Sequence, residues 1–223
     1  METSFLKWVL KDLQMTTTTN SRESTHSIVT LRDVSWETYE RLRCADGNRG
    51  VRMTYDHGVL ILMAPSRRHE RIAEILGRLV FAWTEDRQIA CLSGGSTTMK
   101  SRLLERGLEP DKCFYIQHEA AVRDRDEYDA EIDPPPDLVI EVDVTSMSTA
   151  RLPLYADFQV PEIWRWIDNR VEIYRLVDAA YVQVENSVSM SEFPFELAAK
   201  ILELRFEVDE TNLARRFRAA ISE

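Results

Sequence analysis

The chain has 223 residues and is 44% hydrophobic, which is enough for one domain with a real core, or for such a domain with an extension. Its formal net charge of −10 argues against a protein that coats nucleic acid through bulk charge, although an enzyme with a local basic groove is compatible with it. No run of 18 apolar residues occurs, which argues against a membrane span.

Residues 1–28 are expected to form an N-terminal extension, and residues 29–223 a single domain. Phe5, Trp8, Val9 and Leu13 could form a short amphipathic helix, and the Thr/Ser/Asn run that follows is typical of a flexible linker. The segment lacks the architecture of a signal peptide. Met15 could equally be the natural start, and that alternative stays open.

The first half of the domain predicts a helix, a hairpin and a second helix. Residues 31–44 have the pattern of a helix that Ser35 caps. Residues 51–65 are typical of a hairpin that turns at Asp56, His57 and Gly58. Residues 66–87 give the clearest helix, because apolar side chains recur at a spacing of three to four.

The second half predicts mainly strands. We expect a strand over 88–100 with a kink or bulge at Gly94 and Gly95, a short strand over 112–117, a loop or edge hairpin over 118–133, and a strand over 137–144. A short helix over 149–159, with Pro153 in its first turn, precedes a meander over 162–188 and a C-terminal helix over 210–222. This order indicates a mixed α/β (α+β) layer fold.

Three carboxylates share one face of the apolar strand over 137–144. Side chains alternate along a strand, so Asp137, Glu141 and Asp143 point the same way. Burying a carboxylate costs free energy, and a metal ion, a basic partner or solvent at the end of the strand could offset that cost. Asp111 opens the strand over 112–117, and two neighbouring strands could bring it to Glu141. Such converging carboxylates suit Mg²⁺, which can activate water and polarise a phosphodiester.

The cysteines and histidines do not indicate a zinc site. Cys44, Cys91 and Cys113 show no CxxC spacing, and the four histidines are scattered. The simplest interpretation is free thiols in a reducing, cytoplasmic compartment.

Three segments resemble a family of small standalone bacterial proteins related to restriction endonucleases, within the PD-(D/E)xK nuclease superfamily. They are "YDHGVLILMAPSRRHERI", "GLEPDKCFYIQ" and "PPPDLVIEV" with the following "LPLYADFQVPEIWRW". The resemblance spans about residues 30–205. It implies a restriction endonuclease-like central mixed β-sheet flanked by helices, with an N-terminal hairpin. It also implies a Mg²⁺-dependent (or Mn²⁺-dependent) endonuclease that cleaves nucleic acid, most simply DNA, and leaves a 5′-phosphate.

The resemblance also implies roles for individual residues. Asp111 corresponds to the acid of the "PD" half-motif, and Glu141 to the acid of the "(D/E)xK" half-motif. Asp137 would lie at the mouth of the same strand and assist in binding the metal. Glu70, in "HER" on the long helix, would support a metal-bound water. Members of the superfamily often form dimers, so a homodimer is expected, and the Trp-rich meander could supply its apolar patch.

The chain departs from the superfamily pattern at the lysine. Asp143 stands where the motif has lysine, and Arg151 stands where many members of the family carry a later lysine. Arginine cannot act as a base at ordinary pH, but it can clamp a phosphate oxygen or stabilise developing charge. Asp143 could serve as the base instead.

Each of these residues also has a purely structural interpretation. Asp137 and Asp111 could satisfy turns, Asp143 could leave the sheet into solvent, and Glu141 could form a buried ion pair with Arg151. Glu70 lies in a first helical turn, which favours acids anyway. His69 heads an apolar stripe and is interpreted as a core histidine. A second hypothesis for function is therefore a non-catalytic domain that binds nucleic acid or a protein partner, with its carboxylates paired to arginines.

Basic side chains gather at two helix positions. Arg67, Arg68 and Arg71 form a patch beside the expected site, which could meet phosphate or could simply be a solvated helix start. Arg215, Arg216 and Arg218 are interpreted as a solvated face of the C-terminal helix.

Overall fold

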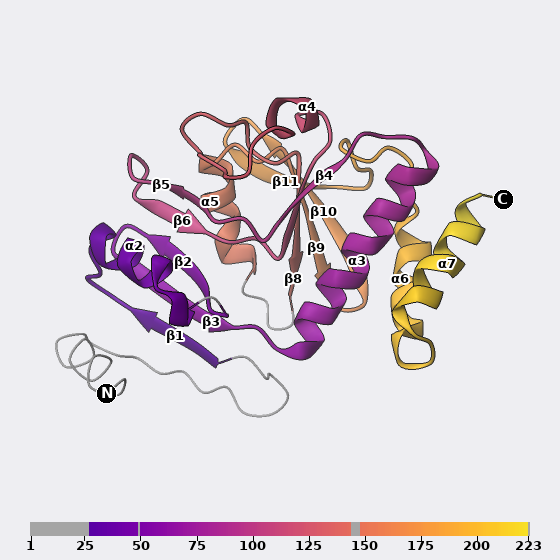
Figure 1. Cartoon of the computed structure of the whole chain (residues 1–223), viewed down its shortest axis with the longest axis horizontal. Coiled ribbons are helices and arrows are strands. Elements are labelled where there is room, and N and C mark those ends of the chain that lie inside the picture. Colours follow the sequence, from indigo (N-terminus) through magenta and orange to yellow (C-terminus); the bar gives the residue numbers. More distant parts are fainter. Residues whose placement is uncertain (1–26, 49, 144–147, 223) are drawn as a thin grey trace. The chain divides into compact units, whose positions relative to one another are not determined.

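The computed structural model describes residues 27–48, 50–143 and 148–222, which form two compact units (Figure 1). The first unit comprises the described residues up to Ser66 together with Met99–Glu109. The second comprises Arg67–Thr98 and the described residues from Pro110 onward. The amphipathic helix and linker expected near the N-terminus lie outside the described residues.

The first unit is built on a five-stranded antiparallel sheet in the order β1-β3-β2-β6-β5. The hairpin expected over 51–65 is confirmed, and its two turn residues, His57 and Gly58, both have positive φ, as tight hairpin turns require. Ser35 caps the first helix by accepting a hydrogen bond from the backbone N–H of Thr38. The elements are β1 (Ser27–Leu31), α2 (Trp36–Cys44), η1 (Asp46–Asn48), β2 (Arg52–Asp56), β3 (Val59–Ala64), β5 (Met99–Ser101) and β6 (Arg106–Leu108).

An aromatic cluster closes the core of the first unit. Tyr39 stacks on Tyr55 with ring centroids 4.9 Å apart, and Trp36 meets both rings edge-on. Gly107 lies against Tyr39 so closely that a Cβ at this position would stand 2.2 Å from the Tyr39 hydroxyl oxygen. The sheet therefore requires glycine at this position for close packing.

Gly107→Ala is expected to lower the free energy of unfolding by about 2 kcal/mol, because Tyr39 is fully buried and can yield only by disturbing the cluster. Denaturant unfolding measures the change. The matched control is Gly47→Ala, where an added Cβ meets no atom within 4 Å, so the effect should stay within about 0.5 kcal/mol. Equal losses in the two variants would contradict the packing argument.

The second unit is built on a six-stranded mixed sheet in the order β11-β10-β9-β8-β7-β4. β8 and β9 pair in parallel and the other neighbours are antiparallel, so the chain crosses over between these two strands through η2 and α5. The elements are α3 (Arg67–Asp86), β4 (Leu92–Gly95), β7 (Lys112–Tyr115), α4 (Glu119–Val122), β8 (Leu138–Val142), η2 (Ser148–Arg151), α5 (Leu152–Asp157), β9 (Glu162–Ile167), β10 (Arg170–Val177), β11 (Ala180–Val184), α6 (Phe195–Glu203), η3 (Leu204–Phe206) and α7 (Glu210–Ile221).

Helices α3, α6 and α7 pack together against this sheet and form its main core (Figure 1). The apolar stripe of α3 meets Leu138, Ile140 and Val142 of β8, and α6 and α7 add Leu202 and Phe217. The predicted mixed sheet flanked by helices is therefore confirmed, and so is the α+β fold class. The bulge expected at Gly94 and Gly95 is present as a register shift between β4 and β7.

Several elements were not anticipated from the sequence. The sequence shows no strong local signal for β1, β6 and α6. The expected loop over 118–133 contains the short helix α4. Trp164 and Trp166 lie in the core, so they do not supply the apolar patch suggested for a dimer. No helix in the described part of the chain is long and apolar enough to span a membrane.

Candidate active site

The antiparallel register of β7 and β8 places Asp111 opposite Glu141. Lys112 pairs with Ile140, and the same register continued by one residue sets the two acids side by side on one face. Asp111 also accepts a hydrogen bond of 2.7 Å from the backbone N–H of Val142, the residue after Glu141. The convergence of Asp111 and Glu141 expected from the sequence is thus present within the second unit.

Asp111 is buried and only half satisfied. Its Oδ2 accepts the bond from Val142 and lies 3.0 Å from Nε2 of His69, in the first turn of α3. Its Oδ1 is buried and has no hydrogen-bond partner among the described residues. A buried acceptor left unpaired is costly. A ligand bound at Oδ1 of Asp111 would remove this cost.

Glu141 is held by two donors from the segment that follows β8. Arg151 Nη1 lies 2.6 Å from Glu141 Oε2, and the Tyr155 hydroxyl donates to Oε1. Burial raises the pKa of Glu141 to about 7, with a further rise from the neighbouring Asp111 and an opposing effect of Arg151. Burial also keeps the pKa of the Tyr155 hydroxyl well above its usual range, so Tyr155 remains a donor.

The contact of His69 with Asp111 is the feature of the site that was not predicted from the sequence. Burial lowers the pKa of His69, but the contact with Asp111, the nearby Glu70 and the charges of Asp111 and Glu141 outweigh burial and raise the pKa to about 9. His69 is therefore buried, as the sequence predicts, and is also paired with Asp111. The signal that could have found it was its position in "HER", directly beside the patch of arginines at the start of the helix.

Asp137 lies at the other end of β8. Its Oδ2 accepts hydrogen bonds from the backbone N–H groups of Ile116 (2.6 Å) and His118 (3.0 Å), and its Oδ1 lies 2.7 Å from His118 Nδ1. Four residues of extended chain, roughly 13 Å, separate it from Glu141. The structure thus gives Asp137 the turn-satisfying role and does not bring it to Asp111 and Glu141.

Asp143 and Glu70 lie in surroundings that differ from those of Asp111, Glu141 and Asp137. Asp143 is buried against Arg165, with Oδ2 at 2.5 Å from Nη2 and 3.1 Å from Nε. It does not leave the sheet into solvent. Glu70 lies in the first turn of α3 with half of its side chain exposed, and its Oε1 is 3.8 Å from His69 Nδ1.

The sequence predicts a Mg²⁺ or Mn²⁺ ion at Asp111 and Glu141. No group of three or more His, Cys, Asp or Glu side chains suited to a metal occurs among the described residues. Mg²⁺, however, is often held by one or two carboxylates, with waters and substrate phosphates as its other ligands. Asp111 and Glu141 form such a pair, and the unpaired Oδ1 of Asp111 supplies an acceptor. The pair therefore fits a Mg²⁺ or Mn²⁺ ion.

The mixed sheet and the acid pair on adjoining strands are features of restriction-endonuclease-like proteins. The family model Uma2, described as "Putative restriction endonuclease", matches residues 36–206, and the chain belongs to this family. The resemblance inferred from the sequence is thereby confirmed. Among solved structures, the chain is similar to a protein from Anabaena variabilis described as "a putative nuclease belonging to DUF820", with a TM-score of 0.47 and 16% identity over 62% of this chain and 83% of that one. No curated protein gives a significant match.

Proposed function

We propose that the protein is a Mg²⁺-dependent endonuclease, able to use Mn²⁺ instead, that hydrolyses phosphodiester bonds of nucleic acid, with DNA as the expected substrate. The observation that carries this proposal is the buried pair of Asp111 and Glu141, in which Oδ1 of Asp111 has no hydrogen-bond partner in the described part of the chain. Membership of a family described by its nuclease character supports it.

Each residue of the site has a role that follows from its contacts. Asp111 and Glu141 would hold the ion, which supplies Lewis-acid polarisation of the phosphodiester and a lowered pKa for its water. His69 orients Asp111 through the contact of 3.0 Å, and Tyr155 orients Glu141. Glu70, half exposed at the start of α3, would accept a proton from a water near His69.

Arg151 would contact the scissile phosphate. Its guanidinium already bonds Glu141 and, at 3.2 Å, the Tyr155 hydroxyl, so it is held beside the acid pair. Arginine donors suit a phosphate oxygen and can stabilise its developing charge. Asp143 stays outside this scheme as a structural partner of Arg165. Asp137 stays outside it because it lies at the far end of β8.

One observation favours a second candidate function, a nuclease-fold domain without catalysis that binds nucleic acid or a protein partner. Glu141 is paired with Arg151, and Asp143 with Arg165, as that hypothesis expects. Such ion pairs can neutralise buried carboxylates without a metal. The two candidates differ in whether a divalent ion binds at Asp111 and Glu141.

Thermal unfolding with and without millimolar Mg²⁺ or Mn²⁺ separates them. An ion at ten times its Kd should stabilise the parent by about 1.4 kcal/mol. For a chain of this size that raises the midpoint by roughly 3–6 °C. Asp111→Asn and Glu141→Gln should abolish the rise. In the same buffers the parent should cleave plasmid and labelled oligonucleotide, and each variant should be slower by about 100-fold or more, as expected for a lost metal.

Asp137→Asn is the matched control, because it changes a buried carboxylate at the far end of the same strand. It should keep both the metal response and the cleavage. A parent that neither responds to the ions nor cleaves would refute the nuclease proposal and favour the binding domain. Light scattering on the same samples tests the homodimer, which we retain as part of the proposal.

A further inference from the structure

Arginines gather along one side of the second unit although the whole chain carries a net charge of −10. Helices α3 and α7 lie alongside each other and run in the same direction. Arg71 Nε bonds Glu210 Oε1 at 3.2 Å near their starts, and Arg218 Nη2 lies 2.5 Å from Glu85 Oε2 further along. The arginine surface is defined by Arg68, Arg71, Arg78, Arg215 and Arg218, and the buried Arg205 lies beside Arg71.

One end of this surface adjoins the candidate active site. Arg68 immediately precedes His69, the partner of Asp111, and is exposed. Arg71 Nη2 donates to the backbone carbonyl of Arg205 at 2.5 Å. Burial lowers the pKa of Arg205, and so do the nearby charges of Arg68 and Arg71. Arg71 is paired with Glu210, so Arg68 is the exposed arginine of this group that could meet an anion.

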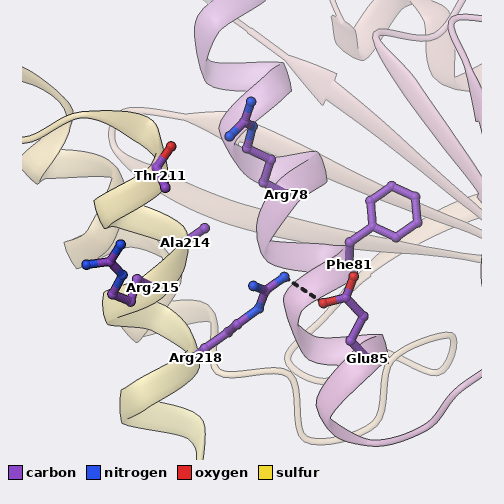
Figure 2. Close-up of a pocket in the computed structure, with 7 residues that line it drawn as sticks. All are labelled: Arg78, Phe81, Glu85, Thr211, Ala214, Arg215 and Arg218. Atoms are coloured by element: carbon purple, nitrogen blue, oxygen red, sulfur yellow. Dashed lines mark hydrogen bonds and ion pairs between the residues drawn. The ribbon is translucent and has the colours of Figure 1, made fainter.

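The other end is a groove between α3 and α7 with a volume of about 460 Å³ (Figure 2). Arg218 forms an ion pair with Glu85, and Arg78 lies 3.6 Å from Glu74. Arg215 is exposed and has no ion pair among the described residues. The groove thus keeps a surplus of positive charge. It is lined by Arg78, Phe81, Glu85, Thr211, Ala214, Arg215 and Arg218.

Two exposed phenylalanines accompany these arginines. Phe81 in the groove is 36% exposed, and Phe206 beside the first cluster is 75% exposed. The guanidinium of Arg205 lies 4.4 Å from the ring centroid of Phe206. Rings beside arginines are stacking platforms for unpaired bases, whereas the bases of an intact duplex are not available to them. The combination favours a single strand over a duplex.

We infer that the arginine surface binds a single strand of nucleic acid that leads to the bond cleaved at Asp111 and Glu141. The inference rests on the proposed nuclease function, and it specifies the substrate as nucleic acid with an unpaired segment. From Arg68 to Glu85 the helix rises roughly 26 Å. That length would accommodate about seven phosphates of a stacked strand.

Fluorescence anisotropy with a labelled 12-nucleotide strand and with the matching duplex tests the inference. The protein carries Asp111→Asn and the buffer contains no divalent ion, so binding is measured without cleavage. The strand should bind about tenfold more tightly than the duplex. Arg78→Ala combined with Arg215→Ala should weaken strand binding by about tenfold and reduce the slope of log affinity against log salt by about 1.4. Phe206→Leu, which keeps apolar bulk but removes the ring, should cost about tenfold as well.

The control is Arg41→Ala, which removes an exposed arginine of α2 in the first unit and should leave binding unchanged. Equal or tighter binding of the duplex would overturn the single-strand assignment. Unchanged binding in the arginine and Phe206 variants would overturn the surface itself. If the strand binds through these arginines while the parent cleaves nothing in Mg²⁺ or Mn²⁺, the proposed function fails and the surface stands as a binding site.

Discussion

Arg165→Leu is expected to lower the free energy of unfolding by about 3–5 kcal/mol, the largest stability effect of any single substitution at the carboxylates discussed above. Arg165 is buried and bonds Asp143 through Nε and Nη2, and it reaches Glu172 through Nη1 at 3.3 Å. Without it, Asp143 keeps a charge with only 2% of its side chain exposed to solvent. Most of the loss therefore comes from the burial of a carboxylate that has lost its arginine, rather than from a strong ion pair.

Denaturant unfolding of a double-mutant cycle isolates that cost. Arg165→Leu combined with Asp143→Leu removes both charges and should recover most of the lost stability, as replacement of buried pairs by apolar side chains often does. Glu172 remains supported by Arg170 and Tyr174 in the double variant. A loss below about 1 kcal/mol for Arg165→Leu would contradict the structural role given to this pair. A wild-type cleavage rate in the double variant would separate Asp143 from catalysis.

The sequence predicts those parts of the fold whose signal is local. The period of three to four in α3 and the Asp56-His57-Gly58 turn between β2 and β3 each predict one element, and both elements are present. β6 has three residues and contains Gly107, whose place depends on Tyr39 from α2. Such an element is stabilised by contacts distant in sequence, so its own residues carry little of the signal.

The candidate site likewise contains residues whose placement could be predicted from the sequence and residues whose placement could not. Asp111 and Glu141 could be paired from the sequence because both lie on strands that become neighbours. The alternation of side chains along β8 predicts that Asp137 and Glu141 point to the same face of the sheet. It does not predict that four residues of extended chain place them near opposite ends of the strand. His69 was assigned to the core from its stripe, whereas its pairing with Asp111 depends on the end of α3 meeting the start of β7. Only tertiary structure supplies that contact.

Arg151→Lys is expected to raise the rate of metal-dependent cleavage by about tenfold, which stays below the usual contribution of general acid–base catalysis. Arg151 lies beside Glu141 with only 15% of its side chain exposed. A guanidinium cannot release a proton at ordinary pH, whereas burial lowers the pKa of an ammonium and lets it exchange a proton with water. A lysine at this position could still donate to Glu141, so the acid keeps a cationic partner.

Arg151→Met supplies the comparison, because it keeps a long side chain and removes the charge. It should cleave about 100-fold more slowly than the parent, since both the phosphate contact and the partner of Glu141 are lost. Single-turnover cleavage measures the chemical step in all three proteins, and circular dichroism checks that each is folded. If Arg151→Lys were slower than the parent, the planar fork of donors that bonds both Glu141 and Tyr155 would be the feature that matters. Arginine at this position would then be a working replacement for the lysine of the motif.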